Sequence, residues 1–172
     1  GFDLAFIANP DLQLNAWSAS GGPESIPHYG AAFLFLDYFL ERFGERATRA
    51  LVAHQANGFA AMDAVLQQLN IVDPLYGNPI NIDIFFADWT VANYLGDTSW
   101  ADGRYGYHDY TDAPRAMATS SLNCTAPLGE FSVHQYAADY ITINCPNATS
   151  ARFSGTEQVH AVPAKPHSGD FM

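Results

Sequence analysis

The chain has 172 residues, of which 48% are hydrophobic, and this is enough for one substantial core or two small ones. Its 18 acidic and 7 basic side chains give a net charge of −11, which argues against nucleic acids and anionic membrane surfaces as partners because both would repel it. No apolar run approaches the roughly 18 residues that a membrane span requires. We therefore expect an acidic, soluble protein.

Residues 27–44 contain the longest nearly pure apolar run and are expected to form a central helix. Apolar side chains recur there at helical spacing, and the polar ones fall on one remaining stripe. Gly44 supplies the left-handed residue that commonly ends a helix, and Pro27 can precede the first turn. The pattern predicts a mostly buried helix over residues 29–43.

More helices are expected around this one, and short connections between them imply antiparallel neighbours in a bundle. A short helical piece comes first and ends at Asn9-Pro10, since the residue before a proline is pushed out of the helical region. The last helix begins with Asp83 as its predicted N-cap and stops at Gly96. The helices that follow the central one are predicted over residues 45–54, 59–69 and 81–95.

From about residue 116 the sequence changes to alternation of strand-forming residues. The sequence therefore predicts an α+β fold, with a helical domain of about four helices over residues 1–115 and a β-rich module over residues 116–172. Three or four short strands with open edges usually need more strands or a partner, so this module is expected to be incomplete. Strands are predicted at residues 131–136, 140–143, 152–155 and 158–162.

Cys124 and Cys145 are the only cysteines and lie 21 positions apart in a region rich in Ser, Thr, Asn and Tyr. A disulfide between them is predicted, and closing a loop of that size contributes about 3 kcal/mol in the loop-entropy model. The alternative is two buried free thiols. Asn123 and Asn147 each begin an N-glycosylation sequon, which matters only in a host that glycosylates.

Chemical motifs are scarce in this sequence. The six histidines form no H-E-x-x-H, no H-x-H and no zinc-ligand spacing with the cysteines. The loop over residues 97–112 carries four aspartates but lacks the order of a calcium-binding loop, so a solvated acidic loop is expected. Nucleophile-elbow and phosphate-binding motifs are absent as well. No metal site is predicted within this chain.

Several segments nevertheless resemble one family in wording and in order. They are FIANPDLQLNAWS, HYGAAFLFLDYFLERFG, LVAHQANGFAAMDAVL, FFADWTVANYLGD and GRYGY. The chain resembles secreted bacterial zinc metallopeptidases of the gluzincin type, related to the immune inhibitor A group. The later segments HQYAADYITINC and RFSGTEQVHAVPAKPHSG are similar to the β-rich module that follows the peptidase domain there, which implies the start of a β-sandwich.

In that family these segments lie downstream of the H-E-x-x-H helix and of an Asn-Glu-Gly that gives the third zinc ligand. The resemblance implies that the chain is a fragment or processed part of such a peptidase, extracellular, with zinc expected in the full-length parent. Because the zinc ligands and the general base are missing, the chain alone is expected to be inert. His28 and Tyr29 are the implied transition-state donors, the alternative being ordinary hydrogen bonds at the start of a buried helix.

A different class of function is also open, an extracellular structural, self-assembling or adhesion subunit derived from a peptidase scaffold. Either function needs a partner, which is the remainder of the precursor or further copies of the chain. Gly1 is expected to be a processed end or the limit of an excerpt. Apolar surface around Phe33, Phe35 and Leu36, together with strand edges over residues 140–143, is expected to remain open for that partner.

Overall fold

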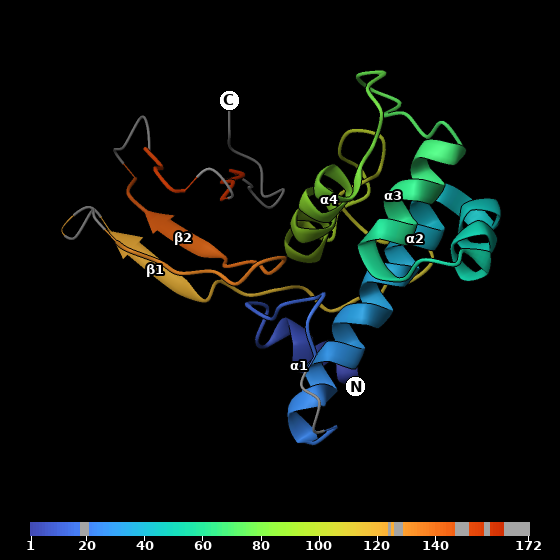
Figure 1. Cartoon of the computed structure of the whole chain (residues 1–172). Helices are drawn as coiled ribbons and strands as arrows, with labels where there is room; N and C mark the ends of the chain where they lie inside the picture. The colour runs from blue at the N-terminus through green and yellow to red at the C-terminus, as the bar shows by residue number, and fades with distance from the viewer. Residues whose placement is uncertain (18–20, 124, 126–128, 147–151, 157–158, 164–172) are drawn as a thin grey trace.

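The computed structural model describes residues 1–17, 21–123, 125, 129–146, 152–156 and 159–163. The fold is α+β, as predicted, with a helical part followed by strands (Figure 1). The helices are α1 (Phe2–Ile7), η1 (Pro23–Ser25), α2 (Ile26–Ala53), α3 (Gly58–Gln68) and α4 (Ile82–Leu95), and the strands are β1 (Ser120–Asn123) and β2 (Ile141–Asn144).

Helix α2 is the central element, and the predicted helix over residues 29–43 lies within it. Gly44 interrupts it with φ 75° and ψ 175°, so the prediction of a break there is confirmed. Glycine suits this position because a side chain is strained at such a φ. The chain then resumes a helical path up to Ala53, which corresponds to the predicted second helix.

Helix α1 crosses α2 at Gly30, beneath the bundle in the view of Figure 1. A Cβ atom built on Gly30 would lie 1.9 Å from the carbonyl oxygen of Phe2, so only glycine lets the two backbones approach this closely. The short helix ends at Ile7, ahead of Pro10, as the sequence predicts. The crossing buries Phe6 and Ile7 against the core.

The hydrophobic core lies between α2 and the later helices. Phe35 packs edge-on against Phe85 and Trp89 of α4, with ring centroids 5.0 Å apart in both pairs. Aromatic pairs of this kind add about 0.5–1.5 kcal/mol beyond the area they bury. Other fully buried side chains of the core are Leu34, Tyr38 and Phe39 of α2 and Val65 and Leu66 of α3.

The start of α4 corrects one prediction. Its N-cap is Asn81, whose side chain accepts a hydrogen bond from the amide of Ile84 at 2.9 Å, and not Asp83. Asp83 lies in the first turn and accepts a hydrogen bond from the Tyr136 hydroxyl at 2.7 Å. At the other end Gly96 has φ 52° and closes the helix, as predicted.

The strands differ more from the predictions. β1 and β2 pair in parallel, with Ser120 opposite Ile141 and Asn123 opposite Asn144. The strand predicted over residues 131–136 is wrong, because its backbone is used in loop contacts: the amide of His134 donates to Asp11, and Tyr136 adopts φ 48°. The described residues of the last two predicted strands, 152–155 and 159–162, form no strand either. The sheet in the described part of the chain consists of β1 and β2 alone.

The part after residue 116 packs on the helices through two tyrosines. Tyr136 lies against Phe59 and Phe86, with ring centroids at 4.4 and 5.3 Å. Tyr140 stacks on Tyr94 and donates its hydroxyl to the carbonyl of Thr90 at 2.8 Å. The two predicted domains therefore share contacts, and the boundary at residues 115/116 stays a prediction.

Cys124 lies outside the described residues, so the predicted disulfide with Cys145 stays a prediction. The last pair in the parallel register is Asn123 with Asn144. Each of these residues directly precedes a cysteine in the sequence, which supports the predicted disulfide.

The two predicted glycosylation sites differ in what the structure describes. Asn123 of the first sequon is exposed, and Asn147 lies outside the described residues. Among the helices of the described part, none is both long and apolar enough to cross a bilayer.

Candidate functional site

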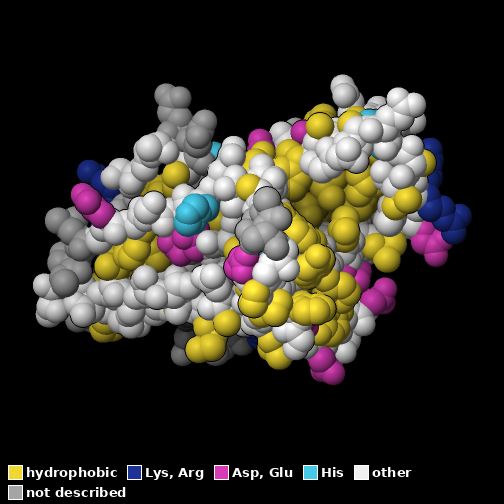
Figure 2. Space-filling view, turned by 60° about the horizontal axis from the view of Figure 1, so that its bottom comes forward, with side chains coloured by type: hydrophobic (Ala, Val, Ile, Leu, Met, Phe, Trp, Pro, Cys, Tyr) yellow, Lys and Arg dark blue, Asp and Glu magenta, His cyan; other side chains and the backbone are white. Residues whose placement is uncertain are grey.

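One side of α2 carries apolar side chains that the rest of the described chain leaves about half exposed. Their exposed fractions range from 38 to 55%, and we call them the apolar face of α2: Ile26, Tyr29, Phe33, Leu36 and Leu40. Figure 2 shows hydrophobic side chains gathered on the side of the molecule that α1 and the start of α2 occupy, with the larger groups of basic side chains at the two ends of the view. Patches of this kind on a soluble protein usually mark an interface.

Aromatic rings extend this face at the start of α2. The Trp17 ring lies edge-on to Tyr29 at 4.9 Å between centroids, and Phe2 of α1 lies 6.0 Å from Tyr29. Trp17 and Phe2 are both well exposed. The face is therefore widest at its N-terminal end.

His28 and Tyr29, the predicted transition-state donors, occupy different environments. His28 is only 8% exposed, its ring stacks on Trp17 at 5.3 Å, and its Nδ1 has no hydrogen-bond partner among the described residues. Burial lowers the pKa of this imidazole, which favours the neutral form. Tyr29 is exposed on the apolar face. Trp17 contacts both, but only Tyr29 is open to a molecule that approaches the face.

Carboxylates flank the apolar face along the side nearest the loop over residues 108–110. Glu41 accepts hydrogen bonds from the amides of His108, Asp109 and Tyr110 at 2.6, 2.9 and 3.3 Å, which fixes that loop to α2. Asp37 has one buried oxygen, Oδ2, with no donor in the described part of the chain. Burial raises the pKa of Asp37, and the charges of Glu41 and Asp109 raise it further.

The expectation of an open surface around Phe33, Phe35 and Leu36 is right for two of these residues. Phe33 and Leu36 belong to the apolar face, whereas Phe35 is 2% exposed and points into the core. Helical spacing explains this, because residues 33 and 35 lie about 200° apart around the axis. Near the predicted strand edge Ile143 is exposed, whereas Tyr140 is partly buried against the core.

A buried ion network supports the loop that follows α4, and the sequence did not reveal it. Arg104 is 3% exposed, and its Nη1 donates to Asp73 at 2.7 Å and to Asp88 at 3.2 Å, while its Nε donates to Asp102 at 2.7 Å. Asp102 also accepts from Arg42 of α2 at 3.1 Å. The expected solvated acidic loop is therefore wrong at Asp102, which belongs to this structural network.

The network makes stability depend on pH. Its hydrogen bonds to Arg104 lower the pKa of Asp73 to about 2, so the contribution of this carboxylate is complete above its ordinary pKa and is lost as the pH falls toward 2. We expect the free energy of unfolding to fall between about pH 4 and pH 2 in urea titrations.

Asp73→Asn is the matched variant for this effect, because it keeps the shape of the side chain and removes its titration. Its unfolding free energy should depend less on pH across this interval than that of the unmodified chain. Equal slopes for the two proteins would contradict the assignment.

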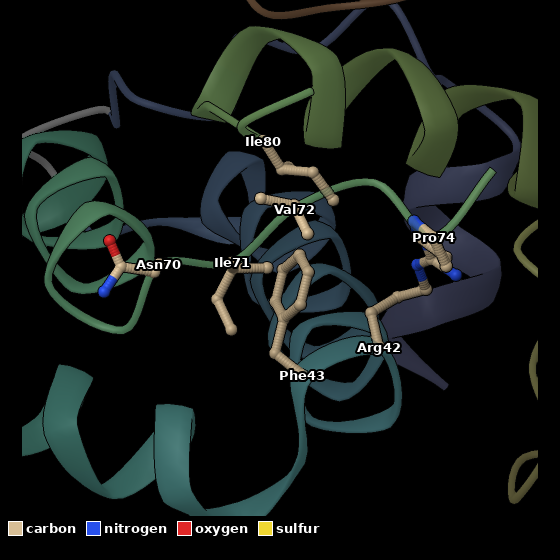
Figure 3. Close-up of a pocket in the computed structure, with 7 residues that line it drawn as sticks. All are labelled: Arg42, Phe43, Asn70, Ile71, Val72, Pro74 and Ile80. Carbon is tan, nitrogen blue, oxygen red and sulfur yellow. The ribbon is translucent and has the colours of Figure 1, made fainter. Parts of the chain in front are cut away.

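Hollows also lie elsewhere among the described residues, and two of them are well formed enough to compare with this face. The one in Figure 3 has a volume of about 300 Å³ and lies between Arg42 and Phe43 of α2 and the connection from α3 to α4. Its one charged lining side chain, Arg42, is engaged with Asp102. A second hollow of about 560 Å³ lies between α1 and residues 114–119, and its lining is mostly apolar. Neither brings together groups for acid–base or nucleophilic chemistry.

Among the described residues, no group of three or more His, Cys, Asp or Glu side chains could hold a metal ion. The zinc that the resemblance implies does not fit these residues, so we assign them no step of zinc-dependent catalysis by themselves.

No family model matches the chain, and no curated protein or solved structure is significantly similar to it. The apolar face of α2 is thus the feature of this fold that most clearly indicates a function.

Proposed function

We propose that this chain is the helical part of a secreted zinc metallopeptidase, together with the start of the module that follows it, and that the rest of the enzyme packs on the apolar face of α2. The observation that carries the proposal is the exposure of five apolar side chains on the central helix of the bundle. The segment resemblance to gluzincin peptidases supports it, because that family has a catalytic helix in addition to these segments. The zinc and the general base would come from that part.

In this arrangement the chain contributes a surface and, at its N-terminal end, a hydrogen-bond donor. Tyr29 is the better candidate for contact with a substrate, since it is exposed whereas Trp17 and the core enclose His28. A phenol placed at a developing oxyanion stabilises it without a proton transfer.

A self-assembling or adhesion subunit is the second candidate, and the same apolar face supports it. The net charge of −11 and the carboxylates beside the face oppose close packing of identical chains. We therefore place the precursor ahead of further copies as the partner.

The zinc content of two proteins tests the proposal. Residues 1–172 alone are expected to bind no zinc stoichiometrically and to hydrolyse no peptide, whereas the full-length gene product should bind one zinc ion and hydrolyse peptides. The gene should also encode an H-E-x-x-H motif ahead of Gly1.

Tightly held zinc in residues 1–172 that is lost on replacing any two of its histidines would overturn the proposal. A gene without the motif would do the same and would favour the assembly function.

A further inference from the structure

The spacing of the apolar face indicates the kind of element that covers it. Its residues follow one another at intervals of three, four, three and four positions, from Ile26 to Leu40. This alternation keeps side chains in one line along a helix and is the pattern by which two helices pack side by side at a shallow angle. The line spans about 20 Å at 1.5 Å per residue, so the occupant needs about four helical turns.

The flank of the face indicates the charge of that occupant. Asp37 follows Leu36 directly and lies one turn after Phe33, so it borders the line of apolar side chains. A covering helix would remove Asp37 further from water, and an unpaired buried acceptor is costly. Asp37 is only partly buried, with Oδ2 already enclosed, so covering the rest of its carboxylate favours a partner that donates a hydrogen bond to it.

A cation is the donor that this position favours. The groups that face Asp37 from its own helix and from the loop packed beside it are Glu41 and Asp109, both acidic. Farther along the same side, Asp3 of α1 accepts a hydrogen bond from Tyr110 at 2.6 Å, and the Tyr110 ring contacts Phe33. A second acidic side chain brought here would be repelled, whereas a Lys or Arg would pair with Asp37.

We infer that the apolar face of α2 receives an amphipathic helix from the rest of the same gene product, and that this helix carries a Lys or Arg opposite Asp37. The inference rests on the proposed function for the source of the helix. A second copy of the chain fits less well, because it would bring its own row of carboxylates to the same border.

Two synthetic helical peptides test the inference on residues 1–172. Both have 18 residues with apolar side chains at three-four spacing, and they differ only at the flanking position next to the central apolar residue, which is Lys in one and Glu in the other. Fluorescence anisotropy gives the two dissociation constants. The Lys peptide should bind about tenfold more tightly, and the difference should shrink to about twofold or less in Asp37→Asn.

Two further variants serve as controls for folding and for position. Phe33→Glu should abolish binding of both peptides while the circular dichroism spectrum is unchanged. Glu45→Gln should leave both constants unchanged, because Glu45 is exposed beyond Gly44 and pairs with Arg49.

Equal binding of the two peptides, or no binding of either, would overturn the inference. So would a chain that forms dimers which the peptides dissociate, because the occupant would then be a second copy. None of these results involves zinc, so a failure removes the covering helix but leaves the assignment to a zinc peptidase standing. A gene that lacks H-E-x-x-H removes that assignment without affecting peptide binding.

Discussion

Replacing Arg104 by methionine is expected to lower the free energy of unfolding by about 3–5 kcal/mol, because it leaves buried carboxylates without their counter-charge. The change removes the ion pairs of Arg104 with Asp73 and with Asp102, each of which is 2.7 Å long. The Tyr38 hydroxyl donates to the Arg104 carbonyl at 2.6 Å, so the loop is also attached to α2 at this point. Urea unfolding at pH 7, followed by circular dichroism, measures the change.

Arg49→Met is the matched control for this prediction. Arg49 pairs with Glu45 on the exposed end of α2, where ion pairs contribute between 0 and about 1 kcal/mol. Its replacement should change the free energy of unfolding by less than about 0.5 kcal/mol. If Arg104→Met lowers the free energy of unfolding no more than Arg49→Met does, the buried network does not hold the loop that follows α4.

Gly30→Val should displace α1 from α2. A Cβ atom at this position would lie 1.9 Å from the Phe2 carbonyl oxygen, a distance that the backbone can relieve only by moving apart. The packing of Phe6 and Ile7 in the core would then be lost, including the stacking of Phe6 on Trp89 at 5.4 Å. Exposing two such side chains costs about 3–6 kcal/mol in the free energy of unfolding.

Gly44→Ala provides the comparison within the same helix. Nothing lies within 4 Å of a Cβ built on Gly44, so only backbone strain at its positive φ opposes the change. The expected loss is about 1–3 kcal/mol, because φ 75° with ψ 175° lies in a region that almost only glycine adopts. Similar losses for the two substitutions would mean that α1 does not depend on close contact at Gly30.

The helices were the most predictable part of the fold. Gly44 correctly marked the interruption of α2 and Gly96 the end of α4, because a glycine at positive φ leaves the helical conformation whatever packs around it. Spacing could not tell Phe33 from Phe35, since a helix that is apolar around most of its circumference does not indicate which side its neighbours occupy. That choice depends on where α1 and α4 pack, which is a tertiary property.

The strands and the ion network were less predictable for a related reason. The strand-forming residues 131–136 join no strand of the described part of the chain, because the backbone there bonds to residues near the N-terminus such as Asp11 and Leu14. The carboxylate partners of the Arg104 side chain lie up to 31 positions away in the sequence, at Asp73. The one local signal was Asp102, two residues before an arginine in a region with few basic residues.

The most direct measurement of the central claim is photo-cross-linking from position 33 in the full-length gene product. With benzoylphenylalanine in place of Phe33, on the apolar face of α2, mass spectrometry identifies the segment that lies against it. The proposal predicts a cross-link within one molecule to a helix encoded ahead of Gly1. A cross-link to residues 1–172 of a second molecule, or the absence of any cross-link, would contradict it.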